Sequence, residues 1–185
     1  HVDGAKMLLE NGANIEAADN KGMTCLHFAR SEAMVKFLIK NGAVVNSLAT
    51  DKTTPLHYAS NKEIAMLLID SEANINVKDA DGSTPLHWAA SSRADVAKEL
   101  ITAGANLNIK DSSGLTPLDN ANDESRALLL KKGAKMGNQL VMLEYDLVNR
   151  ELIINGVAGE TYSIEHSINL LKWKKLTSIT MDSAI

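Results

Sequence analysis

Apolar and polar residues follow a pattern over roughly the first 135 residues that predicts pairs of short amphipathic helices joined by polar turns. One pair is clearest after residue 84. Thr84 is an N-cap candidate before Pro85, which fits the first turn of a helix, and Gly104 ends the second helix in the left-handed conformation. The second helix has one apolar stripe, formed by Val96, Ala97, Leu100 and Ile101. Since such short helices are unstable alone, their stacking predicts a solenoid.

The same pattern returns along the chain as two short phrases that stay in phase. The first phrase recurs at spacings of 30, 30 and 32 residues, as Thr24–Ala29, Thr54–Ala59, Thr84–Ala89 and Thr116–Ala121. The second phrase occurs as Gly12–Ile15, Gly42–Val45, Glu72–Ile75, Gly104–Leu107 and Gly133–Ala134. Two phrases locked in phase over more than a hundred residues indicate repeated structural units of turn, helix, turn and helix.

These phrases resemble the ankyrin repeat, most completely between Asp79 and Asn108. The resemblance covers residues 1–135 and implies a mainly α fold. It divides that domain into a half unit at 1–16 and four units near 17–47, 48–77, 78–109 and 110–135. Since the chain opens inside a second helix, we expect it to be a piece of a longer protein.

Several positions depart from the family pattern. Two units have 30 residues where the family has about 33, so tight corners are expected between their helices at Ser31–Ala33 and Ser60–Lys62. Glu72 replaces a capping glycine and is expected to adopt a positive φ. Ala49 and Lys52 replace the aspartate and glycine of a turn, so that turn is expected to be irregular.

The last part of the chain, residues 138–185, lacks the repeat and predicts a small α+β segment. We expect a hairpin of Leu140–Val148 and Glu151–Ile154 with a turn at Asn149–Arg150, then a helix over Ser163–Lys175 and a possible short strand over Leu176–Met181. Two interpretations stay open: a cap docked on the last repeat, or the start of a larger second domain, which is favoured.

Composition and charge narrow the possible functions. A chain that is 45% hydrophobic and 23% charged is typical of globular proteins. A net charge of −4 does not favour nucleic-acid binding. No apolar run is long enough to cross a membrane, and the single cysteine suits a reducing, cytoplasmic compartment. We therefore expect no nucleic-acid or membrane partner.

Three histidines, His27, His57 and His87, recur once per unit. A ladder of metal sites is one interpretation, but stacked units lie ~10 Å apart, too far for two imidazoles to share a metal with bonds of ~2.1 Å. The resemblance implies instead that each histidine forms hydrogen bonds within and between units. We expect no metal and no cofactor.

Nothing in the sequence predicts a catalytic site. Cys25 lies at a helix start, which lowers a thiol pKa, but it occupies a structural proline position. Asp119 and Asp123 are expected to be ordinary solvated charges. No phosphate-binding loop or nucleophile motif is present.

The resemblance implies instead that a partner protein contacts the turn tips and the concave inner face of the first helices. Met23 and Leu115 are apolar at tips where solvent is expected. Phe28, Tyr58 and Trp88 share one position in successive units, and either pack between first helices or serve as exposed anchors. The candidate partner-binding residues are Lys21, Met23, Phe28, Arg30, Asp51, Tyr58, Asn61, Asp81, Trp88, Ser91, Ser92, Arg93, Ser113 and Leu115.

The leading functional prediction is a non-enzymatic scaffold for protein–protein interaction. The alternative is the substrate-targeting arm of an enzyme whose catalytic domain begins near residue 138. A narrower hypothesis, motivated by the shortened units and by the abundance of Lys, Asn and Ile, is a bacterial effector that acts on host proteins in the host cytoplasm.

Overall fold

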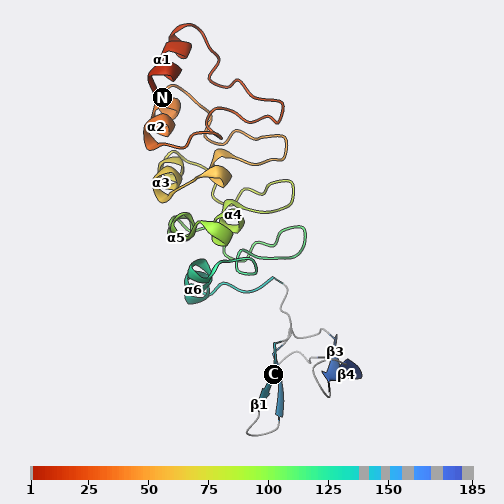
Figure 1. The fold of residues 1–185 in the computed structure, drawn as a ribbon. Helices are drawn as coiled ribbons and strands as arrows, with labels where there is room; N and C mark the ends of the chain where they lie inside the picture. The colour runs from red at the N-terminus through yellow and green to blue at the C-terminus, as the bar shows by residue number, and fades with distance from the viewer. Residues whose placement is uncertain (1, 138–141, 147–150, 156–160, 168–172, 181–185) are drawn as a thin grey trace. The chain divides into compact units, whose positions relative to one another are not determined.

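The computed structural model describes residues 2–137, 142–146, 151–155, 161–167 and 173–180 of the chain (Figure 1). The chain divides into two compact units, residues 1–138 and residues 139–185.

The first compact unit is a stack of nine-residue second helices with a row of hydrogen-bonded loops beside it (Figure 1). The helices are α1 (Val2–Glu10), α2 (Glu32–Lys40), α3 (Lys62–Asp70), α5 (Ala94–Thr102) and α6 (Asp123–Lys131). Ser31, Asn61 and Asn122 cap α2, α3 and α6, because each side chain accepts a backbone N–H three residues later. The predicted corners therefore lie where these helices begin.

The first helices differ in length from unit to unit. Only α4 (Pro85–Ser92) is an α-helix, whereas η1 (Pro55–Tyr58) is one turn of 3-10 helix. The corresponding segments of the units near 17–47 and 110–135 are turns. The prediction of a first α-helix in every unit is therefore wrong. The reason is spacing: nine residues lead from Thr84 to the start of the next helix at Arg93, but only seven from Thr54 to Asn61.

The core lies between the first and second helices and is built from leucine and alanine. Each first helix or turn contributes one leucine with at most 2% exposure. Burying a leucine contributes about 1.5–3 kcal/mol, and the small alanines let neighbouring backbones approach closely. These core residues are Leu26, Leu56, Leu86 and Leu118 from the first helices and turns, Leu38, Leu68, Leu100 and Leu129 from the second helices, and Ala29, Ala59, Ala89 and Ala121.

The loops opposite the second helices, here called the fingers, are joined in series by backbone hydrogen bonds. These bonds are Thr50 N to Lys21 O (2.8 Å), Ala80 N to Asp51 O (2.7 Å) and Ser112 N to Asp81 O (2.9 Å). A second series runs between the units from Glu16, Asn46, Asn76 and Asn108, whose side-chain oxygens accept the N–H of Val44, Asn74, Asn106 and Lys135. Each unit is thus hydrogen-bonded to its neighbours in the stack.

The finger at Ala49–Thr53 is regular, so the expectation of an irregular turn is wrong. Ala49 N–H donates to Thr53 O at 2.9 Å, as in the other fingers, and Lys52 takes the glycine position with φ +62°. The Oδ1 atom of Asp51 accepts hydrogen bonds from the N–H and hydroxyl of Thr53 and so replaces the missing aspartate. The predicted positive φ at Glu72 is confirmed, at +66°.

The second compact unit contains two antiparallel strand pairs. Strands β1 (Met142–Asp146) and β2 (Glu151–Asn155) pair as the predicted hairpin, with Met142 opposite Asn155. The predicted turn at Asn149–Arg150 lies outside the described residues. Strands β3 (Thr161–Ser167) and β4 (Trp173–Thr180) form the other pair, with Thr161 opposite Thr180 and a register shift at Ile164/Glu165.

The prediction of a helix over Ser163–Lys175 is therefore wrong. The segment 161–167 alternates between apolar and polar residues, with Tyr162 and Ile164 two apart, and this is a strand period. The helical stripe depended on Ile168 and Leu171, which lie outside the described residues. The predicted strand at Leu176–Met181 corresponds to the later part of β4.

Candidate functional site

Each of the three recurring histidines connects its own unit to the next one. Within the unit, a threonine N–H donates to Nδ1 at about 3 Å, in the pairs Thr24–His27, Thr54–His57 and Thr84–His87. The Nε2 atoms face carbonyl oxygens of the following unit, at 3.3 Å for Thr53, 3.3 Å for Ser83 and 3.2 Å for Leu115. Because an N–H only donates and a carbonyl only accepts, each ring is neutral and carries its proton on Nε2.

The electrostatics agree with this structural role. Burial lowers the pKa of His27, His57 and His87 below the usual value, although the carbonyl contact opposes the shift. His27 and His57 are fully buried. The implied hydrogen bonds within and between units are thus confirmed. In the part of the chain that the structure describes, no group of three His, Cys, Asp or Glu side chains is placed to hold a metal ion.

Asp119 takes the place of the histidine in the last unit. Its carboxylate accepts a hydrogen bond from the following segment, where the histidines donate one. Its Oδ2 atom accepts from the N–H of Thr116 at 2.7 Å, the hydroxyl of Thr116 at 2.8 Å and the N–H of Gly137 at 2.7 Å. Partial burial raises the pKa of this carboxyl, but the hydrogen bonds outweigh burial and hold the pKa below its usual value. The expectation of a solvated charge is wrong for Asp119, because the next segment offers an N–H instead of a carbonyl.

The aromatic row is packed at one end and exposed at the other. The rings of Tyr58 and Trp88 meet edge to face with centroids 5.3 Å apart, and Trp88 contacts His57 at 5.5 Å. The indole N–H of Trp88 donates to Asp79 Oδ2 at 2.9 Å. Phe28 is 51% exposed. Packing between units therefore describes Tyr58 and Trp88, while Phe28 lies beside the half unit at 1–16, which supplies only a second helix.

A hollow lies beside each end of the row. The inner face is defined here as the surface of the first helices and turns, and the hollow beside Trp88 lies on it. The hollow beside Trp88 has a volume of about 390 Å³ and lies where Asn120 follows the aromatic residues. Its other lining residues include Ser91, Ser92, Arg93 and Pro117. The hollow beside Phe28 has a volume of about 540 Å³ and is mostly apolar, with Ala5, Cys25, Met34 and Leu38 among its lining residues.

Two arginines of the inner face hold the end of η1. Arg93 donates from Nη1 to Ala59 O at 2.7 Å, and from Nη1 and Nη2 to His57 O at 3.2 Å. Arg30 donates from Nη1 to Tyr58 O at 2.9 Å. A helix of four residues leaves its last carbonyls without intrahelical partners, and the guanidinium groups supply the missing donors.

The other candidate residues are distributed over the fingers and helix ends. Lys21, Asp51, Asp81 and Ser113 are exposed on the fingers, whereas Met23 and Leu115 are half-buried. Ser91 and Ser92 are exposed at the end of α4, and Asn61 is the half-buried cap of α3. The structure therefore brings Tyr58, Trp88, Arg30 and Arg93 together and places the finger tips apart from them. Asn120 lines the hollow beside Trp88 but is not among the predicted partner-binding residues. The sequence held a signal for it, because Asn120 interrupts the row of aromatic residues at this position.

Cys25 lacks the properties of a nucleophile. Its thiol is exposed and donates to Ile15 O at 3.1 Å. Partial desolvation, followed by the charge of Glu16, raises the pKa of the thiol. The protonated form, which is a poor nucleophile, therefore predominates at neutral pH.

In the described residues, no helix is long and apolar enough to cross a membrane.

The stacked second helices, hydrogen-bonded fingers and buried Thr–His pairs together define a repeat solenoid. A family model of ankyrin repeats (three copies) matches residues 1–79, 31–111 and 61–139. The chain therefore belongs to the ankyrin-repeat family, whose members are generally protein–protein interaction modules. A comparison with curated proteins found no significant match.

Proposed function

We propose that this chain is a non-enzymatic interaction module that binds a partner protein through its inner face and finger tips. The observation that carries the proposal is the hollow of about 390 Å³ that opens beside Trp88, where Asn120 interrupts the aromatic row. Hollows lined by an aromatic ring are typical anchor points in protein interfaces.

Binding requires little rearrangement of the backbone. The units are held by buried leucines, by Thr–His pairs and by finger hydrogen bonds, and none of these uses the ring of Phe28 or the side chains of Ser91 and Ser92. Ser91 donates only to the carbonyl of Trp88 in its own helix. Inner-face side chains are thus free to contact a partner on a scaffold that is already formed.

An affinity capture from cell lysate, read by mass spectrometry, tests this proposal. The test variant is Asn120→Tyr, which fills the hollow beside Trp88. The matched control is Met66→Ala on α3, a 46% exposed residue that lines neither hollow. Trp88 and Arg93 are unsuitable for this purpose because both make hydrogen bonds within the repeat stack.

We expect the test variant to lose the partners that the unchanged chain and the Met66→Ala control both retain. Circular dichroism and urea denaturation establish that all three chains are folded. Equal recovery of every partner by the test variant and the control contradicts binding at the inner face.

The finer functional hypotheses stay predictions. An effector role and a host-cytoplasmic location rest on the Lys, Asn and Ile bias and the shortened units, and capture from a host-cell lysate tests them. The enzyme-targeting alternative concerns a catalytic domain from residue 138 onward, and assays of a longer chain would reveal it.

A further inference from the structure

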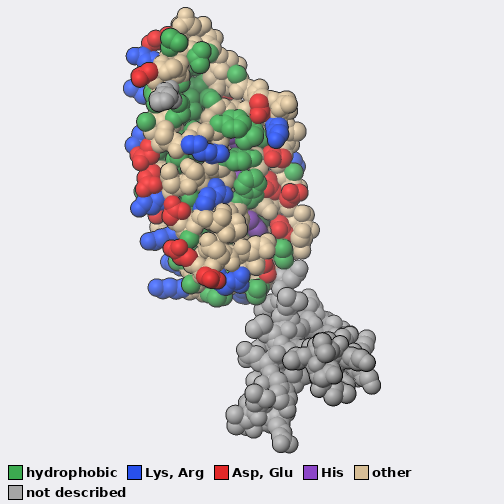
Figure 2. Space-filling model, viewed as in Figure 1, with side chains coloured by type: hydrophobic (Ala, Val, Ile, Leu, Met, Phe, Trp, Pro, Cys, Tyr) green, Lys and Arg blue, Asp and Glu red, His purple; other side chains and the backbone are tan. Residues whose placement is uncertain are grey.

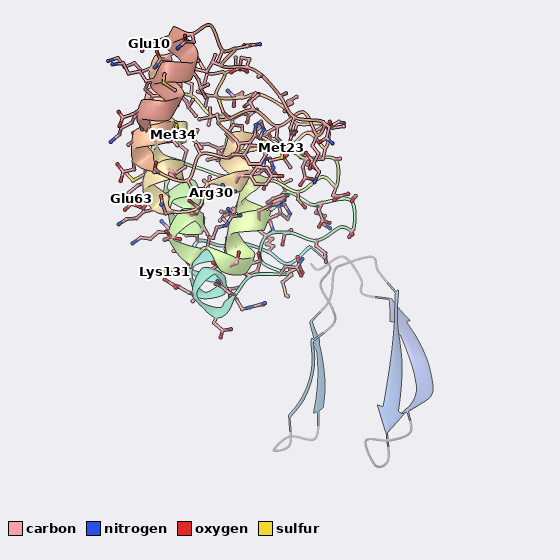
Figure 3. The ribbon with its side chains drawn as sticks, turned by 45° about the horizontal axis from the view of Figure 1, so that its top comes forward. Glu10, Met23, Arg30, Met34, Glu63 and Lys131 are labelled. Carbon is pink, nitrogen blue, oxygen red and sulfur yellow. The ribbon has the colours of Figure 1, made fainter. Side chains whose placement is uncertain are left out.

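Two guanidinium groups from different units converge on one turn of the inner face. Arg30 belongs to the first full unit and contacts the carbonyl of Tyr58, while Arg93 belongs to the third and contacts the carbonyls of His57 and Ala59. Their targets are three successive residues, so the two positive charges lie close together over the end of η1. In Figure 3, Arg30 is labelled between Glu10 at one end of the repeat stack and Lys131 at the other.

Neither arginine is paired with an acid among the residues that the structure describes. The ion pairs found there all lie on second helices, between Lys6 and Glu10, Lys36 and Glu32, and Lys62 and Glu63. Arg93 also feels the repulsion of Arg30, which adds to burial in lowering its pKa, and the opposing effect of Asp95 is smaller. The pair is therefore a focus of uncompensated positive charge on a protein with a net charge of −4.

Two carboxylates lie near this arginine pair, those of Asp95 and Asp111. Asp95 Oδ2 accepts the N–H of Lys62 at 3.1 Å. Arg93 also lines the hollow beside Trp88, together with the hydroxyls of Ser91 and Ser92. One acidic residue, Asp111, lines that hollow, and its Oδ1 atom already accepts the N–H groups of Ser113 and Leu115. Figure 2 shows basic side chains beside hydrophobic ones in the middle of the visible face, with acidic side chains along its borders.

We propose that the inner face binds an extended acidic segment of its partner, with one carboxylate between Arg30 and Arg93 and a neighbouring apolar side chain in the hollow beside Trp88. Arginine donates readily to carboxylate oxygens, and complementary charge selects the partner and speeds its association. The linear order of the two sites across neighbouring units suits an extended segment. This inference rests on the proposed function and specifies the chemistry of the partner.

Selection from a display library of random 12-residue peptides tests the inference on the full chain. We expect the enriched peptides to carry Asp or Glu close to an apolar residue. For a synthesised peptide from the selection, Arg30→Gln should weaken binding about tenfold, measured by fluorescence anisotropy. Lys40→Gln on α2 is the control, because it removes the same charge from an exposed residue outside the inner face. Arg30 is preferred to Arg93 because it makes a single backbone hydrogen bond.

A further measurement separates a direct contact from a general charge effect. Replacing the peptide's acidic residue by its amide should weaken binding to the unchanged chain about tenfold, but should have little effect on the Arg30→Gln variant. Equal losses in both chains overturn the assignment of the carboxylate to this pair. Displacement of the peptide by a single-stranded oligonucleotide that binds more tightly also overturns the proposal, in favour of a nucleic-acid ligand.

The remaining outcomes distinguish this inference from the proposed function. Peptides that lack acidic residues, yet lose binding in the Asn120→Tyr variant, overturn the acidic specificity and leave the binding face in place. A selection without any enriched peptide overturns the inference too. The lysate capture then decides separately whether the inner face binds a protein.

Discussion

Single side chains decide how one unit meets the next. His57 accepts the N–H of Thr54 within its own turn and donates to Ser83 O in the next unit. Asp119 occupies the same place in the last unit, but as an acceptor it selects an N–H, that of Gly137. One position thus uses a donor or an acceptor according to what the following segment offers.

Ser125 places a polar hydroxyl group at a core position that is apolar in other units. It is the third residue after the cap of α6, where α3 has Ile64 and α5 has Val96, and both of those are buried. The hydroxyl of Ser125 is fully buried and lacks a hydrogen-bond partner. A buried hydroxyl without a partner destabilises a fold by about 1–3 kcal/mol.

We therefore expect Ser125→Ala to raise the free energy of unfolding by about 1 kcal/mol, because it removes the unpaired hydroxyl without adding volume. The measurement is urea denaturation followed by circular dichroism. The control is Ser92→Ala at the end of α4, an exposed serine whose replacement should change stability little. A loss of stability in Ser125→Ala contradicts this account.

The length of each first helix follows from the number of residues between its cap and the next cap. The hydrogen bonds that a shortened helix then needs do not follow from the periodic pattern. The distance between Thr54 and the next cap at Asn61 leaves room for only one turn of helix. The carbonyls at the end of η1 then need donors from elsewhere, and Arg30 and Arg93 supply them. In this unit, the short first helix is thus held by arginines from the units on either side.

Arg93→Ala should lower the free energy of unfolding by about 2–3 kcal/mol, because two carbonyls lose charged donors at a half-buried site. Arg93→Lys should lose less, since an ammonium group still reaches one carbonyl. Urea denaturation of the three chains measures the order of stability. If the alanine and lysine variants are equally stable, the hydrogen bonds to η1 do not explain the role of Arg93.

Much of the repeat unit could be predicted from its own residues. The phrases around Thr84 and Gly104 located the helices because caps and glycines mark helix ends physically. The sequence pattern did not predict the regular finger at Lys52. The finger is regular because Asp51 accepts the hydrogen bond that an aspartate at the position of Ala49 accepts in the other fingers. The roles of Arg30 and Arg93 were also missed as structural contacts, because they connect residues about 30 apart.

The free energy of unfolding of the whole repeat stack depends on pH through its three recurring histidines. Burial holds His27, His57 and His87 neutral in the folded chain, whereas the same imidazoles take up protons below about pH 6.5 in the unfolded chain. Below that pH the unfolded state binds more protons, so the free energy of unfolding decreases as pH falls. The pKa of Asp119 is also lowered, which extends the loss toward strongly acid pH.

We expect the repeat stack to be clearly less stable at pH 5.5 than at pH 7.5, with each buried imidazole contributing at most about 1.4 kcal/mol per pH unit. Urea denaturation at both values measures the difference. The variant His57→Gln serves as a control, because it removes one of the three groups and should reduce the pH dependence by about one third of the histidine contribution. Equal stability of the unchanged chain at both pH values would contradict the sign of this linkage.

The hydrogen bonds between units also have a mechanical consequence. At each junction between full units, finger bonds, side-chain oxygens such as that of Asn76, and histidines such as His57 lie side by side. A tensile load applied along the stack is therefore shared within a junction but is transmitted from one junction to the next in series. The weakest junction sets the force at which two units separate, and the units on either side of that junction stay folded.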